Sequence, residues 1–288
     1  MKSEETPNPV IASPIGVFDS GMGGLSIVRE IMRELPTERI FYFADNLHMP
    51  YGPRPLEEVR HFAVNIADRM LRLPVKAVVV ACNTASAAAL KELRALYPGR
   101  IFVGMEPAVK PAARESRTGK VGVLATQATF QGELFESVVD RFAGDVEVVC
   151  RPCPGLAEFI ENHPPDHPAL EGLLRRYIDP LKARGVDHIV LACTHYPLVK
   201  NVITQVAGPE ICIVDPSPAI ARRVRQVLDA AGLLDESGEG SLKVNVSGEM
   251  EHFSRSATIH LGREVCAEQC PFSWVPTRPW DFADIWND

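Results

Sequence analysis

Short apolar runs rich in β-branched residues recur along this chain and predict buried strands. They lie at 15–18, 40–44, 75–81, 101–104, 120–125, 146–150, 188–192, 211–214 and 242–246. Between most of these runs, apolar residues recur at i, i+3, i+4 and i+7, as in amphipathic helices. These helical stripes cover 28–35, 56–66, 134–142, 170–181 and 219–228. Strands that alternate with helices in this way predict an α/β fold with mostly parallel sheets.

Two of the apolar runs resemble each other and end in the same chemistry. One reads VVVACNT and contains Cys82, and the other reads HIVLACTH and contains Cys193. The runs IGVFDS at Ile15 and VGVLAT at Val121 precede these cysteines by similar distances. We therefore predict two pseudo-symmetric domains. Because open α/β sheets bind ligands at the carboxyl ends of their strands, both thiols are expected to face one active-site cleft between the domains.

The order of the elements also predicts how the chain is divided. The first domain is expected to comprise residues 14–105 and 215–262, because the segment after the second break should return to the first sheet. The second domain is expected at residues 106–214. Residues 1–13 are polar and proline-bearing and are interpreted as a loose leader. Residues 263–288 show no clear period and are interpreted as an extended tail.

Composition and charge exclude several classes of function. The formal net charge is -7 and no basic run occurs, so direct nucleic-acid binding is not expected as the main activity. No apolar stretch reaches the ~18 residues that a membrane helix needs, and the first residues do not resemble a secretory signal. The seven cysteines are therefore expected to be free thiols of a cytoplasmic protein.

The paired cysteines are the leading candidates for catalysis. A thiol has a reference pKa near ~8.5, so a modest downward shift gives a thiolate base at neutral pH. Helices that begin directly after Cys82 and Cys193 would favour the thiolate through their amide ends. His195 follows Cys193 by two positions and is a candidate ion-pair partner for that thiol, and Glu161 could orient the histidine. Asp19 is a candidate acid–base group on the Cys82 side, although it could equally be a helix cap.

The glycine-rich run DSGMGG begins at Asp19 and follows the first predicted strand. Glycines at such a place permit unusual backbone angles and let a ligand approach the main chain. Exposed amides at the start of a helix could hold a carboxylate or a phosphate, or the run could be a plain tight turn. Ser26 stands where a dinucleotide fingerprint needs its third small residue, and the GK[ST] of a P-loop is absent.

Two other features have more than one interpretation. Tyr51, in the turn MPYG, could shield a pocket or lie in a surface loop. Cys150 and Cys153 form a C-x-x-C and could join Cys266 and Cys270 as zinc ligands. The context of this motif is poor for a zinc site, so no metal is expected.

The chain closely resembles the glutamate racemases, which belong to the cofactor-independent aspartate/glutamate racemase superfamily. The resemblance covers residues from about 15 to 262, nearly the whole chain. The blocks that carry it are IGVFDSGMGGLSIVREI at Ile15, MPYG at Met49, VVVACNTAS at Val78, GVLATQATF at Gly122, LACTHYPLV at Leu191 and VDPSPAIA at Val214.

This resemblance implies interconversion of L- and D-glutamate, which supplies D-glutamate for peptidoglycan. It implies no cofactor and two acid–base thiols, with Cys82 serving D-glutamate and Cys193 serving L-glutamate. Auxiliary groups beside the thiols would be Asp19, Glu161 and His195. The substrate-binding residues it implies are Asp19, Ser20, Tyr51, Gly52, Asn83, Thr84, Thr126, Thr194 and His195. A homodimer is expected, and some relatives respond to a cell-wall precursor.

Two alternatives remain at this stage. The substrate could be aspartate or another acidic amino acid, because the resemblance favours glutamate only through the DSG start and the pair Thr194 and His195. The scaffold could also serve to bind a protein partner such as a topoisomerase, although a complete pair of cysteines argues against an idle active site. Without a cofactor as electron sink, the carbanion must be stabilised by neutral donors and backbone amides in a water-poor cleft.

Overall fold

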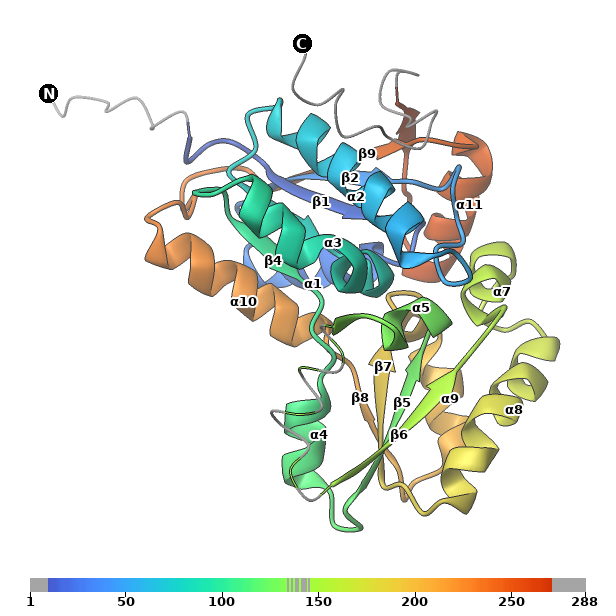
Figure 1. Ribbon diagram of the computed structural model, residues 1–288. Coiled ribbons are helices and arrows are strands. Elements are labelled where there is room, and N and C mark those ends of the chain that lie inside the picture. The colour runs from blue at the N-terminus through green and yellow to red at the C-terminus, as the bar shows by residue number, and fades with distance from the viewer. Residues whose placement is uncertain are drawn as a thin grey trace, which may run out of the picture.

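The structure, a computed structural model, describes residues 10–133, 135, 137, 140, 144 and 146–270. It contains two sheets, which Figure 1 shows one above the other, and every strand pairing within them is parallel. The larger sheet has the order β10 (Ala267–Gln269), β9 (Ser241–Val246), β2 (Arg39–Ala44), β1 (Ile15–Asp19), β3 (Ala77–Val80), β4 (Phe102–Gly104). The smaller sheet has the order β6 (Glu147–Pro152), β5 (Lys120–Ala125), β7 (His188–Ala192), β8 (Cys212–Val214).

The two sheets share one topology. The strands of the smaller sheet lie in the order β6-β5-β7-β8, and four strands of the larger sheet lie in the matching order β2-β1-β3-β4. In both sets, the first strand along the chain lies between the second and the third, and the fourth lies beside the third. Cys82 follows β3 and Cys193 follows β7, and each of these strands is the third along the chain in its set of four. The predicted α/β fold with two pseudo-symmetric halves is therefore confirmed, and the two cysteines occupy equivalent positions.

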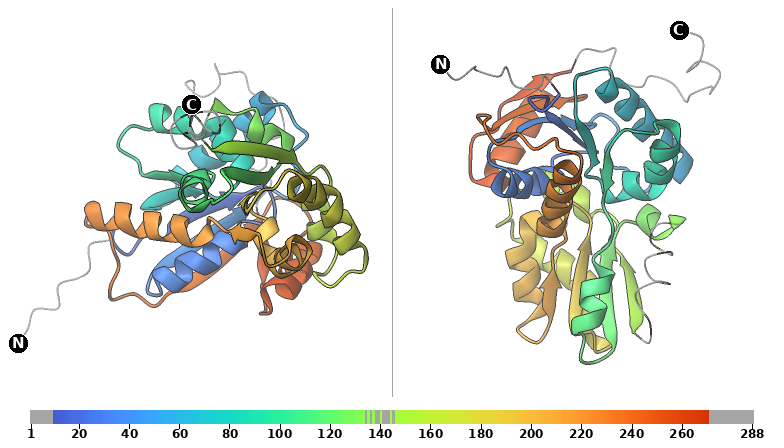
Figure 2. Two further views of the ribbon diagram at one scale, coloured as in Figure 1. Left: turned by 90° about the horizontal axis from the view of Figure 1, so that it is seen from below. Right: turned by 90° about the vertical axis from the view of Figure 1, so that its left-hand side faces the viewer.

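Helices cover both faces of each sheet. They are α1 (Leu25–Glu34), α2 (Leu56–Leu71), α3 (Asn83–Leu96), α4 (Val109–Glu115), α5 (Gln127–Phe130), α7 (Leu156–Asn162), α8 (Ala169–Ala183), α9 (Lys200–Ala207), α10 (Ser217–Ala230) and α11 (Met250–Leu261), with a 3₁₀ turn at Tyr196–Val199. In the larger unit, α1 packs beside α10 and α2 packs beside α3, and in the smaller unit α8 packs beside α9 (Figure 2). No helix among these described residues is long and apolar enough to cross a membrane.

The hydrophobic core explains how the two units are held together. Val17 on one face of β1 and Leu124 of β5 belong to a single buried cluster, which also includes side chains of α1, α8, α9 and α10. The opposite faces have separate clusters, one around Phe18 beneath α2 and α3, and one around Val123 beneath α4. Because burial of apolar surface is the main stabilising term, the continuous cluster ties the two sheets into one body on one side only.

The structure recovers each of the nine predicted strands, with ends that differ by at most a few residues. It adds β10, whose residues 267–269 pair with β9 at the edge of the larger sheet. The tail predicted from residue 263 therefore contains a short edge strand, which forms through its pairing with β9. Residues 271–288 of that tail, most of the leader and most of the helical stripe at 134–142 lie outside the described residues.

Candidate active site

A cavity of about 120 Å³ lies where the carboxyl ends of the two sheets meet. This is well below the roughly 300–1,000 Å³ of a pocket for drug-sized ligands, so it suits a small metabolite. Segments that follow β1, β3, β5 and β7 contribute to its wall, in agreement with the predicted site. Its lining comprises Ser20, Met49, Pro50, Tyr51, Gly52, Pro53, Cys82, Asn83, Thr84, Thr126, Gln127, Cys153, Pro154, Gly155, Ala157, Glu158, Cys193, Thr194 and His195.

Cys82 lies at the start of α3 and is almost fully buried. Its sulfur accepts a hydrogen bond from the backbone N–H of Ala85 at 3.4 Å, and its thiol donates to Ser20 Oγ at 3.9 Å. The expected helix start is thus present. Burial nevertheless raises the pKa of Cys82 well above its usual value, and the nearby carboxyl of Asp19 raises it further. Cys82 is therefore a neutral thiol at neutral pH in the unliganded protein.

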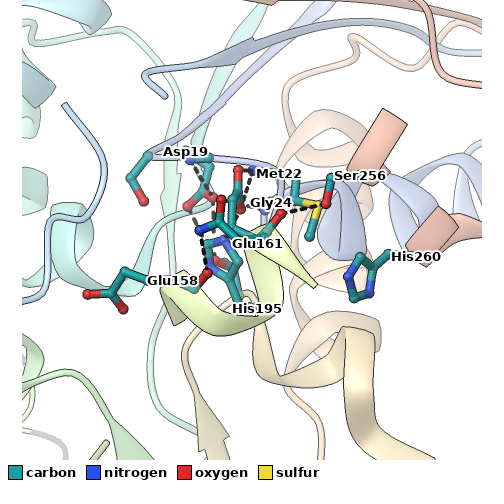
Figure 3. A network of polar contacts seen from close by, with 12 residues as sticks. Asp19, Met22, Gly24, Glu158, Glu161, His195, Ser256 and His260 are labelled. Atoms are coloured by element: carbon teal, nitrogen blue, oxygen red, sulfur yellow. Dashed lines mark hydrogen bonds and ion pairs between the residues drawn. The ribbon is translucent and has the colours of Figure 1, made fainter. Parts of the chain in front are cut away.

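Cys193 has a different set of neighbours. Its sulfur lies 3.9 Å from Nδ1 of His195, and Nε2 of the same imidazole lies 2.5 Å from Oε2 of Glu161 (Figure 3). Burial by itself lowers the pKa of His195, but the hydrogen bonds to Cys193 and Glu161 outweigh it and raise this pKa well above its usual value. His195 is therefore an imidazolium, which is the usual partner of a reactive sulfur.

The glycine-rich run binds two carboxylates of the protein itself. Oδ2 of Asp19 accepts hydrogen bonds from the backbone N–H groups of Gly21 and Gly24 at 3.3 and 3.0 Å. Both oxygens of Glu161 accept from the N–H of Met22, at 3.1 and 3.2 Å. The amides of Gly21, Met22 and Gly24 are therefore not open to a ligand, because the side chains of Asp19 in β1 and Glu161 in α7 already accept from them.

The same run needs small residues because other side chains approach it closely. A Cβ on Gly21 would lie 2.8 Å from Oε1 of Glu161, and one on Gly23 would lie 2.5 Å from Oγ1 of Thr194 and 2.6 Å from Nδ1 of His195. None of these glycines has a positive φ. Close packing across the two sheets, rather than unusual backbone angles, therefore explains the glycines of this run.

A group of hydroxyls joins the two sides of the cavity. Oγ1 of Thr84 lies 3.0 Å from Oγ1 of Thr126 and 3.3 Å from that of Thr129. Beside them, both side-chain polar atoms of Asn83 are buried and have no hydrogen-bond partner. Because an unpaired buried amide is costly, Asn83 is a group prepared to bind a ligand. Gly52 contacts Thr126 across the cleft, where an added Cβ would lie 3.0 Å away.

Tyr51 is buried and forms part of the cavity wall, as one interpretation of MPYG predicted. Its hydroxyl donates to Oδ2 of Asp45 at 2.6 Å. The buried carboxylate of Asp45 also accepts from Ser247 at 2.8 Å and lies 2.9 Å from Nδ1 of His48. Tyr51 is therefore held in place from behind and presents its ring to the cavity.

The structure brings most of the predicted site residues to the cavity wall but leaves two of them behind it. Asp19 and Glu161 do not line the cavity; Asp19 also accepts from Thr194 Oγ1 at 3.3 Å, and burial raises its pKa. They contact the wall residues rather than the cavity itself. A substrate contact for Asp19 is therefore not visible in the unliganded geometry.

Among the wall residues that sequence reasoning did not assign to the site, three have polar or ionisable side chains, Gln127, Cys153 and Glu158. Gln127 and Glu158 follow the ends of β5 and β6, and their position after a strand could have identified them. Burial raises the pKa of the Cys153 thiol to about 12, so it is protonated and donates to the carbonyl of Arg151. The zinc alternative fails, because no cluster suited to a metal occurs among the residues that the structure describes.

Comparisons with known proteins agree with this geometry. The family model described as Asp/Glu/Hydantoin racemase matches residues 15–224. The glutamate racemase of Pseudomonas aeruginosa is 47% identical over 253 residues, which cover 88% of this chain and 96% of that protein. That of a Roseiflexus species is 46% identical over 245 residues, covering 84% of this chain and 90% of that protein.

Solved structures of glutamate racemases also match this chain. A glutamate racemase of Bacillus anthracis superposes with a TM-score of 0.82 at 32% identity, covering 91% of this chain and 98% of that one. The Escherichia coli glutamate racemase, solved with L-glutamate and the activator UDP-MurNAc-ala, has a TM-score of 0.77 at 29% identity and covers 89% and 98%. The chain therefore belongs to the Asp/Glu/Hydantoin racemase family.

Proposed function

We propose that this chain is a cofactor-independent racemase that interconverts L- and D-glutamate through Cys82 and Cys193. The observation that carries the proposal is the placement of these two thiols, which follow equivalent strands of the two sheets and line one small cavity. An amino acid held between them would present one face of its α-carbon to each sulfur. One thiolate removes the α-proton and the other thiol returns a proton to the opposite face.

The unliganded surroundings of the thiols favour one starting state. The Cys82 thiol is protonated because burial raises its pKa, whereas Cys193 lies beside an imidazolium. This state is ready for L-glutamate, since Cys193 can act as the base and Cys82 as the acid. After turnover the protonation states are reversed, so the enzyme must either bind D-glutamate next or exchange the protons with solvent.

The chemistry of the wall supports an acidic amino acid as the substrate. Among the described lining residues there is no lysine or arginine, so the two carboxylates would be bound by neutral donors, with the His195 imidazolium as a nearby positive charge. Asn83 has an unpaired amide, and Ser20, Thr84 and Thr194 offer hydroxyls. Prepositioned donors in a small, largely buried cavity stabilise the carbanion because little reorganisation is needed.

The remaining expectations form part of this proposal. The two units are assigned to residues 14–105 with 215–262 and to residues 106–214, with β10 as an addition to the first. The enzyme is expected to act in the cytoplasm as a homodimer and to supply D-glutamate for peptidoglycan. No cofactor or metal enters the reaction. The relatives that are named glutamate racemases support glutamate over aspartate.

The test is racemisation of each amino acid by the purified protein, followed by circular dichroism of the substrate. Both L- and D-glutamate should lose their optical activity without added pyridoxal phosphate and in the presence of a chelator. In D₂O the α-hydrogen of the product should be replaced by deuterium. L- and D-aspartate serve as the matched comparison. Faster racemisation of aspartate than of glutamate would refute the proposed substrate, and a requirement for a cofactor would refute the mechanism.

A further inference from the structure

The helix α11 connects two strands of the larger sheet but reaches the smaller unit through two side chains. Ser256 Oγ donates a hydrogen bond of 2.6 Å to the backbone carbonyl of Glu161 (Figure 3). His260 Nε2 donates one of 3.0 Å to the carbonyl of His163. Ser256 is buried. Burial lowers the pKa of His260, so its imidazole is neutral and donates through Nε2.

These two bonds fix the end of α7. The last carbonyls of any helix have no partner within the helix and need one from elsewhere. Glu161 lies in the last turn of α7, and His163 follows directly after the helix. Because α7 is only seven residues long, its own hydrogen bonds hold this turn weakly. The two hydrogen bonds from α11 therefore help to hold this turn, which also packs against α8 and the 3₁₀ turn.

The side chain of Glu161 depends on that position. Its two carboxylate oxygens accept from the N–H of Met22 at 3.1 and 3.2 Å, and Oε2 lies 2.5 Å from Nε2 of His195. Nδ1 of the same imidazole faces the sulfur of Cys193. A small rotation of the last turn would lengthen the contact between Glu161 and His195 and so alter the environment of Cys193 more directly than that of Cys82.

We propose that Ser256, together with His260, is a positioning residue for the Cys193 half of the reaction. Neither side chain lines the cavity, so both act through Glu161 and His195. The expected change in kcat rests on the proposed function, whereas the expected change in the reactivity of the Cys193 thiol does not. Loss of the Ser256 hydroxyl should reduce the reactivity of Cys193 and leave that of Cys82 unchanged.

The experiment compares S256A with S254A. Ser254 lies on the same helix, but its hydroxyl accepts from the N–H of Ala267 in β10 at 3.1 Å, so S254A removes a similar bond that does not reach α7. S256A should lower kcat for glutamate by about tenfold, the effect of one lost hydrogen bond, with KM within about twofold. S254A should keep the wild-type kcat.

Alkylation with iodoacetamide, followed by peptide mass spectrometry, provides a readout that needs no turnover. In S256A the rate at Cys193 should fall severalfold, while the rate at Cys82 stays at the wild-type value. H260A and H260Q form a second pair, because the glutamine amide can replace Nε2 as the donor to His163. In H260A the alkylation rate at Cys193 should fall less than in S256A, and in H260Q this rate should return most of the way to the wild-type value.

Several results would overturn the inference. One is an alkylation rate at Cys193 that stays at the wild-type value in both S256A and H260A. Another is an equal loss of kcat in S254A and S256A, since that would indicate only general weakening of α11. If S256A does not fold, the H260A and H260Q pair decides the question. A wild-type protein that does not racemise glutamate would refute the proposed function, whereas the alkylation contrast would still test the positioning role.

Discussion

The two thiols of the cavity occupy the same place in two copies of one topology, yet their surroundings differ. Cys82 follows β3 and contacts a hydroxyl and a backbone amide, and its burial, together with the nearby carboxyl of Asp19, raises its pKa. Cys193 follows β7 and faces an imidazole that a buried glutamate holds. The repeat places one thiol at each side of the cavity, while the neighbours give the two thiols different electrostatic surroundings.

The difference arises at two equivalent positions. Two residues after Cys82 the chain has Thr84, whereas two residues after Cys193 it has His195. The first strand of the larger sheet ends in Asp19, whereas the equivalent strand of the smaller sheet ends in Ala125. The carboxyl therefore lies on the Cys82 side of the repeat and the imidazole on the Cys193 side. Symmetric placement with asymmetric charge suits a reaction between mirror-image substrates.

The largest expected effect comes from removing either sulfur. C82S and C193S should each lower kcat for racemisation by at least about 10³-fold, within the 10²–10⁴ range of acid–base groups, because serine is a far weaker acid than cysteine. In D₂O, nuclear magnetic resonance should still detect slow α-exchange of L-glutamate in C82S and of D-glutamate in C193S.

The exchange pattern tests the assignment of each sulfur to one enantiomer. Equal exchange of both enantiomers in one variant would show that a single thiol reaches both faces of the α-carbon. Turnover near the wild-type rate in either variant would contradict the two-thiol mechanism altogether. Circular dichroism in the far ultraviolet should confirm that both variants are folded.

A smaller effect is expected from H195N, which leaves a polar group near Cys193 but cannot carry charge or bridge to Glu161. The rate constant kcat should fall by about 10²-fold, the lower end of the range for acid–base groups, because the sulfur remains but loses its cationic partner. Substrate titration should show a KM that changes less than kcat. A loss as large as that of C193S would mean that the imidazole itself handles the substrate proton.

The smallest effect concerns pH and the neutral thiol. Because its pKa is raised, Cys82 should stay protonated as the pH increases from 7 to 9, a range in which an ordinary thiol with a pKa near ~8.5 ionises. Alkylation at Cys82 should therefore be much slower than that of N-acetylcysteine measured in parallel, and its rate should still rise about tenfold per pH unit near pH 9, where that of N-acetylcysteine levels off. D19N removes the carboxyl that raises this pKa, so alkylation at Cys82 should speed up by at most about tenfold, the equivalent of one pKa unit.

The opposite outcome would be equally informative. If Cys82 is alkylated at pH 7 as fast as at pH 9, it is a thiolate in the free enzyme, and the distinction between the two sulfurs would disappear. If D19N slows alkylation at Cys82, the Asp19 carboxyl assists that thiol rather than opposing its ionisation.

Most of the fold could be predicted from local pattern, because buried parallel strands are continuous apolar runs that need no tertiary information to be recognised. The strand β10 could not, since residues 267–269 have no apolar period and form a strand only through pairing with β9. The glycines of DSGMGG were found, but their role was not. The side chains that approach these glycines too closely for a Cβ include those of Glu161, Thr194 and His195, which are distant in sequence.

The sequence by itself determined the two cysteines, the strands that carry them and the α/β class, because each depends on neighbouring residues and a repeated pattern. Only the tertiary structure decided how the two sulfurs differ. A pKa depends on burial and on charges a few ångströms away, and the groups that set it for Cys82 and His195 come from segments that meet only when both sheets have folded. The reach of α11 to the end of α7 is likewise a property of the folded chain, since nothing in the spacing of Ser256 and Glu161 predicts their contact.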